Sequence, residues 1–418
     1  MKLKKLIGLM AVAGFALPGA AMATNGYFSH GYGMKAKGMG GAATAMSQDA
    51  FGGANNPASM VFAGDRLDLG VDLFSPKRSA SRTGSGTTLN GSTDSDSNYF
   101  GIPEFGYNKM LNPNMSLGVT VYGNGGMNTD YPSGQYNCGA GAANMMCGSG
   151  SLGVDLMQLM IAPTVAFKIA PNHSIGVSPL IGYQRFKAEG LQGFDNTTKS
   201  SSPGNVTNRG YDDSFGYGVR VGYMGKITPA ITIGAAYASK MNMDKFDKYK
   251  GLFAEQGAFD IPENYNLGIA FQATPELTLA LDYQRINYSG VKSISNPSTN
   301  QAQLGSSGGP GFGWQDIDVW KLGAAYQYNK QWTLRAGYNH GDNPIQARDV
   351  TFNILAPGVV QDHATLGVTY LTATGGELTV SYMHAFENKV SGNSLAFGGT
   401  ETIKMYQNAI GVAYGWKM

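Results

Sequence analysis

Met115-Ser-Leu-Gly-Val-Thr-Val-Tyr122 alternates apolar residues with small or polar ones and ends in an aromatic side chain. Similar stretches recur at residues 231–237, 277–283, 332–338 and 378–382. A period of two residues predicts a β-strand with one apolar and one polar face. The polar positions hold Thr, Gly, Ser, Asp and Arg, which are too hydrophilic for the dry interior of a soluble sandwich. The pattern is typical of a membrane barrel, with apolar side chains toward lipid and polar ones toward a lumen.

The first 23 residues have the pattern of a secretory signal peptide. Three lysines lie among the first five residues, residues 6–17 are apolar, and Ala21-Met22-Ala23 matches a cleavage site. The apolar run is too short for a membrane-spanning helix. We therefore expect residues 1–23 to be a signal peptide and the mature chain to begin at Thr24.

The composition excludes several classes of protein. Only 14% of residues are charged, whereas soluble domains carry about 25%. Lys and Arg (30) nearly balance Asp and Glu (28), so no basic excess argues for a nucleic-acid partner. No later segment is apolar over 18 consecutive residues, so we expect no membrane-spanning helix.

Long polar connections alternate with short turns. The long ones, rich in Gly, Ser and Asn, lie near residues 78–98, 124–153, 187–212, 240–262, 288–316, 341–361 and 387–401. The short turns lie near residues 112–114, 171–172, 228–229, 274–276, 329–330 and 374–376. In outer-membrane barrels, long loops face outside and short turns face the periplasm. These connections predict an all-β fold over residues 66–418, a 14-stranded antiparallel transmembrane β-barrel with both ends on the turn side.

Alternation also assigns the two faces of the barrel. The side chains expected to face lipid include Leu67, Leu69, Val71 and Leu73 in the first strand and Ile410, Val412, Tyr414 and Trp416 in the last. Those expected to face the lumen include Asp68, Asp72, Thr278, Asp282, Thr333, Arg335, Thr379 and Ser381. Side chains alone do not fill a barrel of fourteen strands. It is therefore either plugged or an open pore.

Residues 24–65 do not follow a strand pattern. They are rich in Gly and Ala, with scattered Met and aromatic residues, which suggests compact short helices and turns. We expect this segment to be an internal hatch that plugs the barrel. The alternative is a flexible periplasmic tail, but a tail would be more polar.

The chain has two cysteines, Cys138 and Cys147, in a Gly/Ala-rich stretch. A signal peptide implies an oxidising compartment, so we expect a local disulfide within a loop. The alternative, a metal or redox site, lacks nearby histidines.

Four motifs carry a resemblance to a known family. They are the segment from Gly31 to Asn56-Pro57-Ala58, Gly337-Tyr-Asn-His-Gly-Asp-Asn-Pro344, Ile261-Pro262-Glu263, and Val380-Ser-Tyr-Met-His384. With these the mature chain resembles the FadL-type outer-membrane transporters, which carry long-chain fatty acids or aromatic hydrocarbons. The resemblance implies a bacterial outer-membrane location. It also implies that Asn56, Pro57 and Ala58 form a hatch motif that anchors the hatch.

The resemblance also implies a transport route. The outer loops capture a hydrophobic molecule, a pocket inside the barrel binds it, the hatch shifts, and the molecule leaves sideways at a kinked third strand. Gly123, Gly125 and Gly126 are candidates for the kink, because glycines allow a break in a ladder. Alternatively, these glycines only begin the next loop. The expected substrate is a long-chain fatty acid, and the alternative is an aromatic or other neutral hydrocarbon.

A fatty acid's carboxylate favours a buried cation, and arginine suits this role. Arg185, in Gly182-Tyr-Gln-Arg-Phe-Lys187, resembles a basic cluster that the family has after a tyrosine. Strict alternation from Ile175 places Arg185 on the lipid face, but a bulge at Pro179 would reverse it. Without that bulge, Arg185 is a snorkelling residue at the membrane interface.

Two further cations are candidate carboxylate ligands. Arg335 has lumen parity and a central-to-upper position in its strand, and Lys321 is a weaker candidate of the same kind. The alternative for Arg335 is a lumenal salt bridge to Asp282. The hatch side chains Tyr27, Phe28, Met34, Met39 and Phe51 are candidate pocket lining, because Met and aromatic groups adapt to apolar ligands. Alternatively, they pack the hatch against the barrel.

Other classes of function lack support. The five histidines are scattered, no Ser/His/acid set can be placed together, and no cluster has metal-ligand spacing, so we expect no enzyme, cofactor or metal. A general porin would need a charged constricting loop, and a purely structural barrel or adhesin would need no hatch. The expected partners are hydrophobic small molecules and the lipid and lipopolysaccharide of the outer membrane. We expect a monomer.

Overall fold

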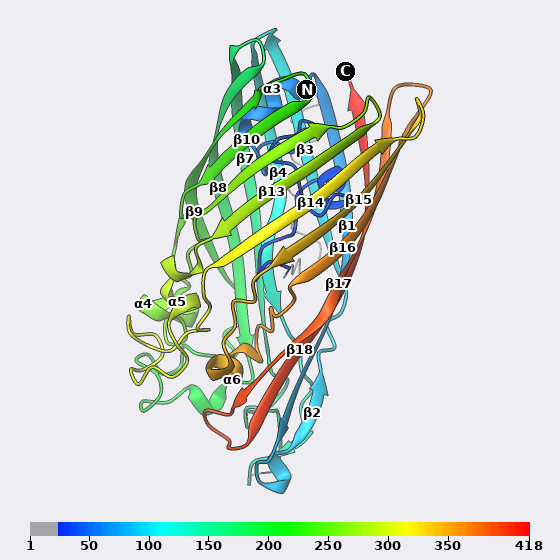
Figure 1. The fold of residues 1–418 in the computed structure, drawn as a ribbon. Coiled ribbons are helices and arrows are strands. Elements are labelled where there is room, and N and C mark those ends of the chain that lie inside the picture. The colour runs from blue at the N-terminus through cyan, green and yellow to red at the C-terminus, as the bar shows by residue number, and fades with distance from the viewer. Residues whose placement is uncertain (1–23, 140) are drawn as a thin grey trace.

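The computed structural model describes residues 24–418 apart from residue 140, so the predicted signal peptide lies outside the described residues. Within them, fourteen strands form a closed antiparallel barrel (Figure 1). The barrel strands are β1 (Arg66–Thr83), β3 (Phe100–Asn112), β4 (Met115–Asn128), β7 (Gly153–Ala170), β8 (His173–Glu189), β9 (Asp212–Lys226), β10 (Ile231–Ala238), β12 (Asn264–Gln272), β13 (Leu277–Ile286), β14 (Ile317–Gln327), β15 (Trp332–Gly341), β16 (Asp362–Leu371), β17 (Glu377–Asn393) and β18 (Thr400–Lys417). Sequential strands pair, and β18 closes the barrel on β1. The predicted fold class and strand number are confirmed.

Long loops gather at one end of the barrel and short turns at the other (Figure 1). The loops carry short strands and helical turns: β2 (Gly91–Asp94), β5 (Tyr136–Asn137), β6 (Ala142–Ala143), β11 (Asn242–Met243), α4 (Ala254–Gly257), α5 (Lys292–Ser295), α6 (Val350–Asn353), η2 (Thr87–Leu89), η3 (Gln192–Phe194), η4 (Asp247–Tyr249), η5 (Tyr288–Gly290) and η6 (Ala347–Asp349). Some predicted loops were too long. In particular, β1 runs on to Thr83 rather than ending near residue 78.

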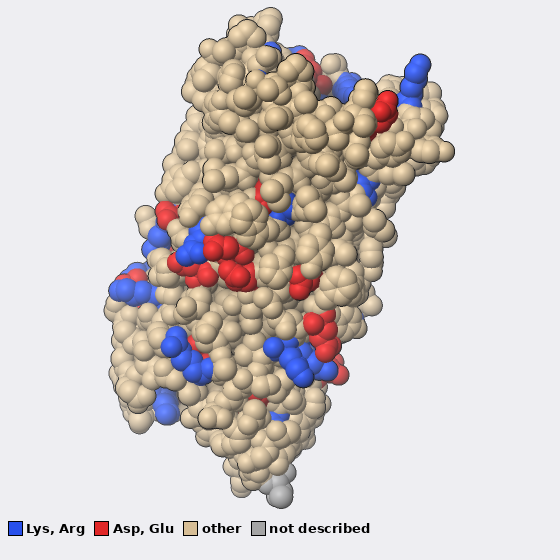
Figure 2. Space-filling view, in the orientation of Figure 1, with Lys and Arg blue, Asp and Glu red and all other residues tan. Residues whose placement is uncertain are grey.

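The two faces of the barrel follow the predicted alternation. Val71 and Ile410 are about half exposed on the outside, whereas Asp68, Asp72 and Asp282 are buried inside. Charged side chains are sparse on the wall in Figure 2 and gather toward the loop end. Among the described residues, no helix is both long and apolar enough to cross a bilayer.

The hatch, residues 24–65, lies inside the barrel, and most of its residues are buried. It contains α2 (Met34–Lys37), η1 (Pro57–Ser59) and α3 (Met60–Ala63). Glycines allow its backbone to approach the wall closely. At Gly337, for example, an added Cβ would lie 2.1 Å from the carbonyl carbon of Met39.

Candidate functional site

Wall carboxylates hold the hatch from several directions. The Lys37 ammonium lies 2.8 Å from an Asp72 carboxylate oxygen and 3.8 Å from one of Glu104, and all three side chains are buried. On the opposite wall, Asp282 accepts hydrogen bonds of 2.8 Å from the backbone N–H groups of Ala43 and Thr44. Buried charges are stable only when they are paired and hydrogen-bonded, so these contacts fix the position of the hatch.

Asn56 joins two parts of the hatch to the wall. Its Nδ2 donates to the carbonyl oxygens of Thr44 (2.8 Å) and Tyr223 (2.9 Å), and its Oδ1 accepts from the N–H of Ala58 (3.1 Å). The last bond caps η1, which begins at Pro57. The expected hatch motif therefore contacts backbone groups of the hatch and of the barrel wall.

Replacing Asn56 with alanine should lower the free energy of unfolding by about 2 kcal/mol, because two buried carbonyls lose their donor. The neighbouring Asn55→Ala is the matched control, since Asn55 donates one bond, to the Tyr32 carbonyl oxygen. Guanidinium unfolding of both variants in lipid vesicles measures the difference. Equal losses of stability would contradict the anchoring role of Asn56.

Above the hatch, aromatic side chains from the N-terminus and from two outer loops meet. This aromatic cluster consists of Tyr27, Phe28, Phe259, Tyr288 and Trp314. The Tyr288 hydroxyl donates to the Asn25 carbonyl oxygen (2.6 Å) and accepts from the Tyr27 N–H (3.1 Å). The Trp314 ring lies edge-on to Tyr288, with centroids 5.2 Å apart. The outer loop 287–316 thus contacts the start of the hatch directly.

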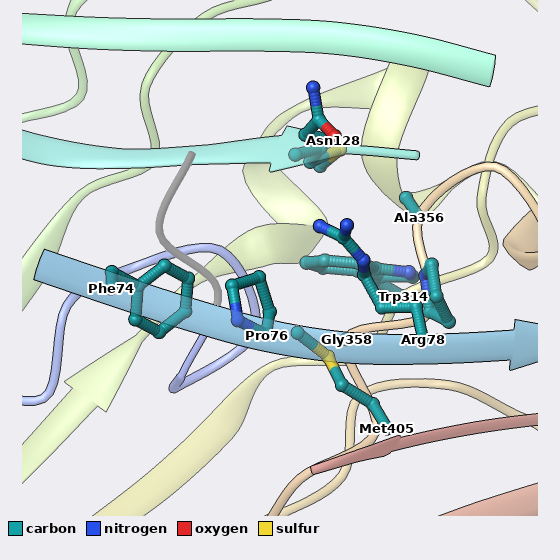
Figure 3. A pocket seen from close by; sticks show the side chains of 10 residues that line it. Phe74, Pro76, Arg78, Asn128, Trp314, Ala356, Gly358 and Met405 are labelled. Atoms are coloured by element: carbon teal, nitrogen blue, oxygen red, sulfur yellow. The ribbon is translucent and has the colours of Figure 1, made fainter. Parts of the chain in front are cut away.

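A narrow central cavity of about 10 Å³ lies beside the aromatic cluster (Figure 3). Its lining is mostly apolar: Phe74, Pro76, Met127, Trp314, Ala356, Pro357, Gly358 and Met405, together with Arg78 and Asn128. The wall strands β1, β4 and β18 supply one side, and the loops after β13 and β15 supply the other. This composition suits a small hydrophobic ligand.

Arg78 is the cation of the central cavity, and it is 4% exposed. Its guanidinium donates to the Ser95 hydroxyl (3.0 Å) and to the Ser97 carbonyl oxygen, while its Nε has no partner. It also stacks on Phe100, 5.7 Å from the ring centroid. In the described part of the chain, Arg78 forms no ion pair with a carboxylate. A buried guanidinium with a free donor can bind an anionic group.

The third barrel strand, β4, has an unpaired edge. β3 pairs with β4 only as far as Phe105 opposite Val121, although both strands continue. The register of β4 against β7 shifts between Gly123 and Gly125, which marks a bulge. We call residues 122–126 the free edge of β4.

The hatch covers this free edge. Phe28 forms an isolated β-bridge with Gly125. The Gly126 N–H donates to the Tyr27 carbonyl oxygen (3.1 Å), and the Ser29 N–H donates to the Asn124 carbonyl oxygen (3.2 Å). The three candidate kink glycines thus lie at a bulge inside β4 rather than in the following loop. Covering an unpaired edge satisfies its backbone groups. Movement of residues 27–29 would expose it.

A second apolar pocket, of about 30 Å³, lies among the outer loops. Phe186, Phe253, Phe312 and Phe352 contribute most of its aromatic lining. Phe312 and Trp314 pack together, with ring centroids 6.3 Å apart. The two pockets therefore adjoin through the same loop.

The three predicted carboxylate-binding cations lie apart from one another. The ladder between β8 and β9 has no register shift at Pro179, so Arg185 stays on the outer face, 3.6 Å from the Tyr211 ring centroid. Arg335 lies near the turn end rather than in a central-to-upper position, and donates to Gln48 and Thr369. Lys321 is buried and lies opposite Asp282 in the β13–β14 ladder. None of the three lines the central cavity.

The predicted lining residues divide into two groups. Tyr27 and Phe28 belong to the aromatic cluster beside the central cavity. Met34, Met39 and Phe51 lie within the hatch: Met34 against Ser381 and Met39 against the backbone of β15. In the loop after β4, Cys138 and Cys147 are joined by a disulfide, with Cα atoms 5.6 Å apart.

Sequence reasoning missed Arg78, Tyr288, Trp314 and Met405. The sequence pattern does contain Arg78. Asp68 and Asp72 face the lumen, and the same alternation places residue 78 on the lumen side when β1 is continued to Thr83. Trp314 and Tyr288 lie in a long loop without periodicity. No pattern in a single sequence places them above the hatch.

The family model described as "Outer membrane protein transport protein (OMPP1/FadL/TodX)" matches residues 9–417. The chain belongs to this family. Members of the OMPP1/FadL/TodX family are outer-membrane β-barrel transporters of hydrophobic compounds and not enzymes. The predicted family and location are therefore confirmed.

Solved structures share the family fold at low sequence identity. The P. putida toluene transporter TodX superposes with a TM-score of 0.69 at 20% identity, covering 93% of this chain and 99% of that one. A Pseudomonas aeruginosa FadL homologue gives 0.71 at 16%, covering 94% and 99%. The Ralstonia pickettii toluene transporter TbuX gives 0.64 at 18%, covering 92% and 98%. A comparison with curated proteins finds no match.

Proposed function

We propose that this protein carries small neutral hydrocarbons, aromatic ones foremost, through the central cavity to the free edge of β4 and into the membrane. The observation that carries the proposal is the lining of the central cavity, which is apolar and aromatic apart from Arg78 and Asn128. The cavity is narrow, so its side chains must move apart to admit a ligand. Two of the similar solved structures are toluene transporters, which agrees with a substrate of this kind.

The route needs no energy source. Burying a hydrocarbon of toluene's size in an apolar cavity is favourable by about 6 kcal/mol at ~0.8 kcal/mol per carbon. The ligand passes from the loop pocket to the cavity beside Trp314. Displacing the Trp314 and Tyr288 rings loosens residues 24–29, and the free edge of β4 then gives a sideways exit. The molecule reaches lipid without entering water.

One observation favours a second candidate function, the transport of long-chain fatty acids. Arg78 is buried in the cavity, its Nε has no partner, and it forms no ion pair with a carboxylate among the described residues. A fatty acid's carboxylate would accept from this Nε while the chain lies along Phe74 and Met405. The cations predicted from the sequence lie elsewhere, so Arg78 takes their place in this candidate function.

Uptake of radiolabelled toluene and oleate by transporter-deficient bacteria tests both candidates. Arg78→Met removes the charge and keeps an apolar side chain, and Arg335→Met is the matched control outside the cavity. We expect toluene to enter cells with either variant. If oleate enters as well and Arg78→Met reduces its uptake about tenfold, the fatty acid function is supported. If neither compound enters although the barrel is folded in the membrane, the proposed transport is wrong.

A further inference from the structure

Three lysines gather on the outer wall near the loop end of β1, β17 and β18. Lys389 lies directly opposite Lys404 in the β17–β18 ladder. Lys404 lies opposite Ser79 in β1, and Lys77 is two residues from Ser79 on the same face. Opposite residues have Cβ atoms about 5 Å apart, and diagonal ones about 7–8 Å. We call Lys77, Lys389 and Lys404 the lysine patch.

The lysine patch lacks internal neutralisation. None of its lysines forms an ion pair among the described residues, whereas Lys187, Lys240 and Lys292 each do. Like charges directly opposite each other destabilise a β-ladder. Such an arrangement is stable when an anionic ligand lies between the charges. Figure 2 shows Lys or Arg side chains beside Asp or Glu side chains on this part of the wall.

The outward row of β18 gives the height of the patch in the membrane. Trp416 marks the turn-side aromatic belt and Tyr406 the loop-side belt, with Val412 and Ile410 exposed between them. Ten residues at about 3.3 Å, tilted by about 40°, span about 25 Å, the height of the apolar band of such barrels. Lys404 is the next outward residue beyond Tyr406. The patch therefore lies at the level of the outer-leaflet headgroups.

A hollow of about 280 Å³ adjoins the patch. Lys77, Lys404, Tyr406 and two carboxylates, Asp94 and Glu387, contribute to its lining. The exposed ring of Tyr99 lies 5.1 Å from the Lys77 ammonium. Cations above an aromatic belt, next to a hollow, match a phosphorylated glycolipid whose acyl chains run down the wall.

We propose that the lysine patch is a binding site for lipopolysaccharide, which it recognises through the phosphate groups of lipid A. Lys389 and Lys404 contact one phosphate together, and Lys77 contacts the sugar edge beside it. Headgroup oxygens also accept hydrogen bonds from the hydroxyls in the hollow. The lysines of the patch lie on the outer face of the wall, whereas Arg78 and Met405 line both the hollow and the central cavity.

The test measures binding of fluorescent bisphosphorylated lipid A to the purified protein, with EDTA present so that Asp94 and Glu387 cannot bind the lipid through divalent cations. The variant combines Lys77→Gln, Lys389→Gln and Lys404→Gln. The control combines Lys187→Gln, Lys240→Gln and Lys292→Gln, which changes the charge equally. We expect the variant to bind at least tenfold more weakly than the control.

Two further arms identify the ligand. Lipid A without phosphates should bind the wild type and the variant alike, and millimolar inorganic phosphate should not displace the phosphorylated lipid. Equal binding by variant and control would overturn the proposal. Tight wild-type binding of the phosphate-free lipid, or displacement by inorganic phosphate, would overturn it too. Circular dichroism confirms that each variant is folded.

Discussion

Replacing Gly125 with alanine should release the start of the hatch from the free edge of β4. An added Cβ would lie 1.9 Å from the Tyr27 carbonyl oxygen, so the backbone of one partner must move. The bonds from Gly126 to Tyr27 and from Ser29 to Asn124 would then be lost. Two such bonds contribute about 2 kcal/mol. Amide hydrogen exchange of residues 24–29 should therefore become about 30-fold faster.

Gly123→Ala is the matched control, two residues earlier on the same strand. An added Cβ there meets only a methyl group of Ile102, at 3.0 Å, which can rotate away. We expect its exchange rates to match those of the wild type. If both variants exchange alike, the hatch does not depend on this edge, and the proposed sideways exit loses its support.

Replacing Lys37 with methionine should have the largest effect on stability. The change leaves the Asp72 carboxylate buried without its cation and removes the charge beside Glu104. Breaking a buried ion pair by removing one partner lowers the free energy of unfolding by about 3–5 kcal/mol. Guanidinium unfolding in lipid vesicles measures this loss.

Lys109→Met is the control for Lys37. Lys109 pairs with Asp65 at the surface, where its side chain is 51% exposed, and such pairs contribute up to about 1 kcal/mol. Adding Asp72→Asn to Lys37→Met should restore part of the stability, because it removes the uncompensated charge. A loss for Lys37→Met no larger than that for Lys109→Met would show that the ion pair does not hold the hatch.

The alternation of apolar and polar residues predicted the wall of this barrel, because each strand has lipid on one side and the polar lumen on the other. Asp282 and Thr379 are buried inside and Ile410 is exposed outside, as parity requires. The same rule fails where the boundary of a strand is misjudged. Because β1 continues to Thr83, beyond the strand end expected near residue 78, the inward position of Arg78 does not follow from the predicted strand.

The site itself depends on contacts that no local pattern records. Tyr27 and Tyr288 are 261 residues apart in sequence, yet the Tyr288 hydroxyl accepts from the Tyr27 N–H. Loop residues such as Trp314 have no periodicity, so their positions depend on packing above the hatch. For Arg185, strict alternation predicts the outer face, and a bulge at Pro179 was the alternative that would have turned it inward. The β8–β9 ladder is continuous at Pro179, so Arg185 lies on the outer face, as strict alternation predicts.

The seam between β1 and β18 has a consequence for biogenesis. It pairs Arg66 with Lys417 and Thr83 with Thr400, so it cannot form until the last strand has been synthesised. Contacts this distant in sequence form late in folding. Closure around an empty lumen would leave Asp72 and Asp282 without their partners. The hatch, which is synthesised before every strand of the barrel, therefore acts as an internal template, and enclosing it and sealing the cylinder are one cooperative step.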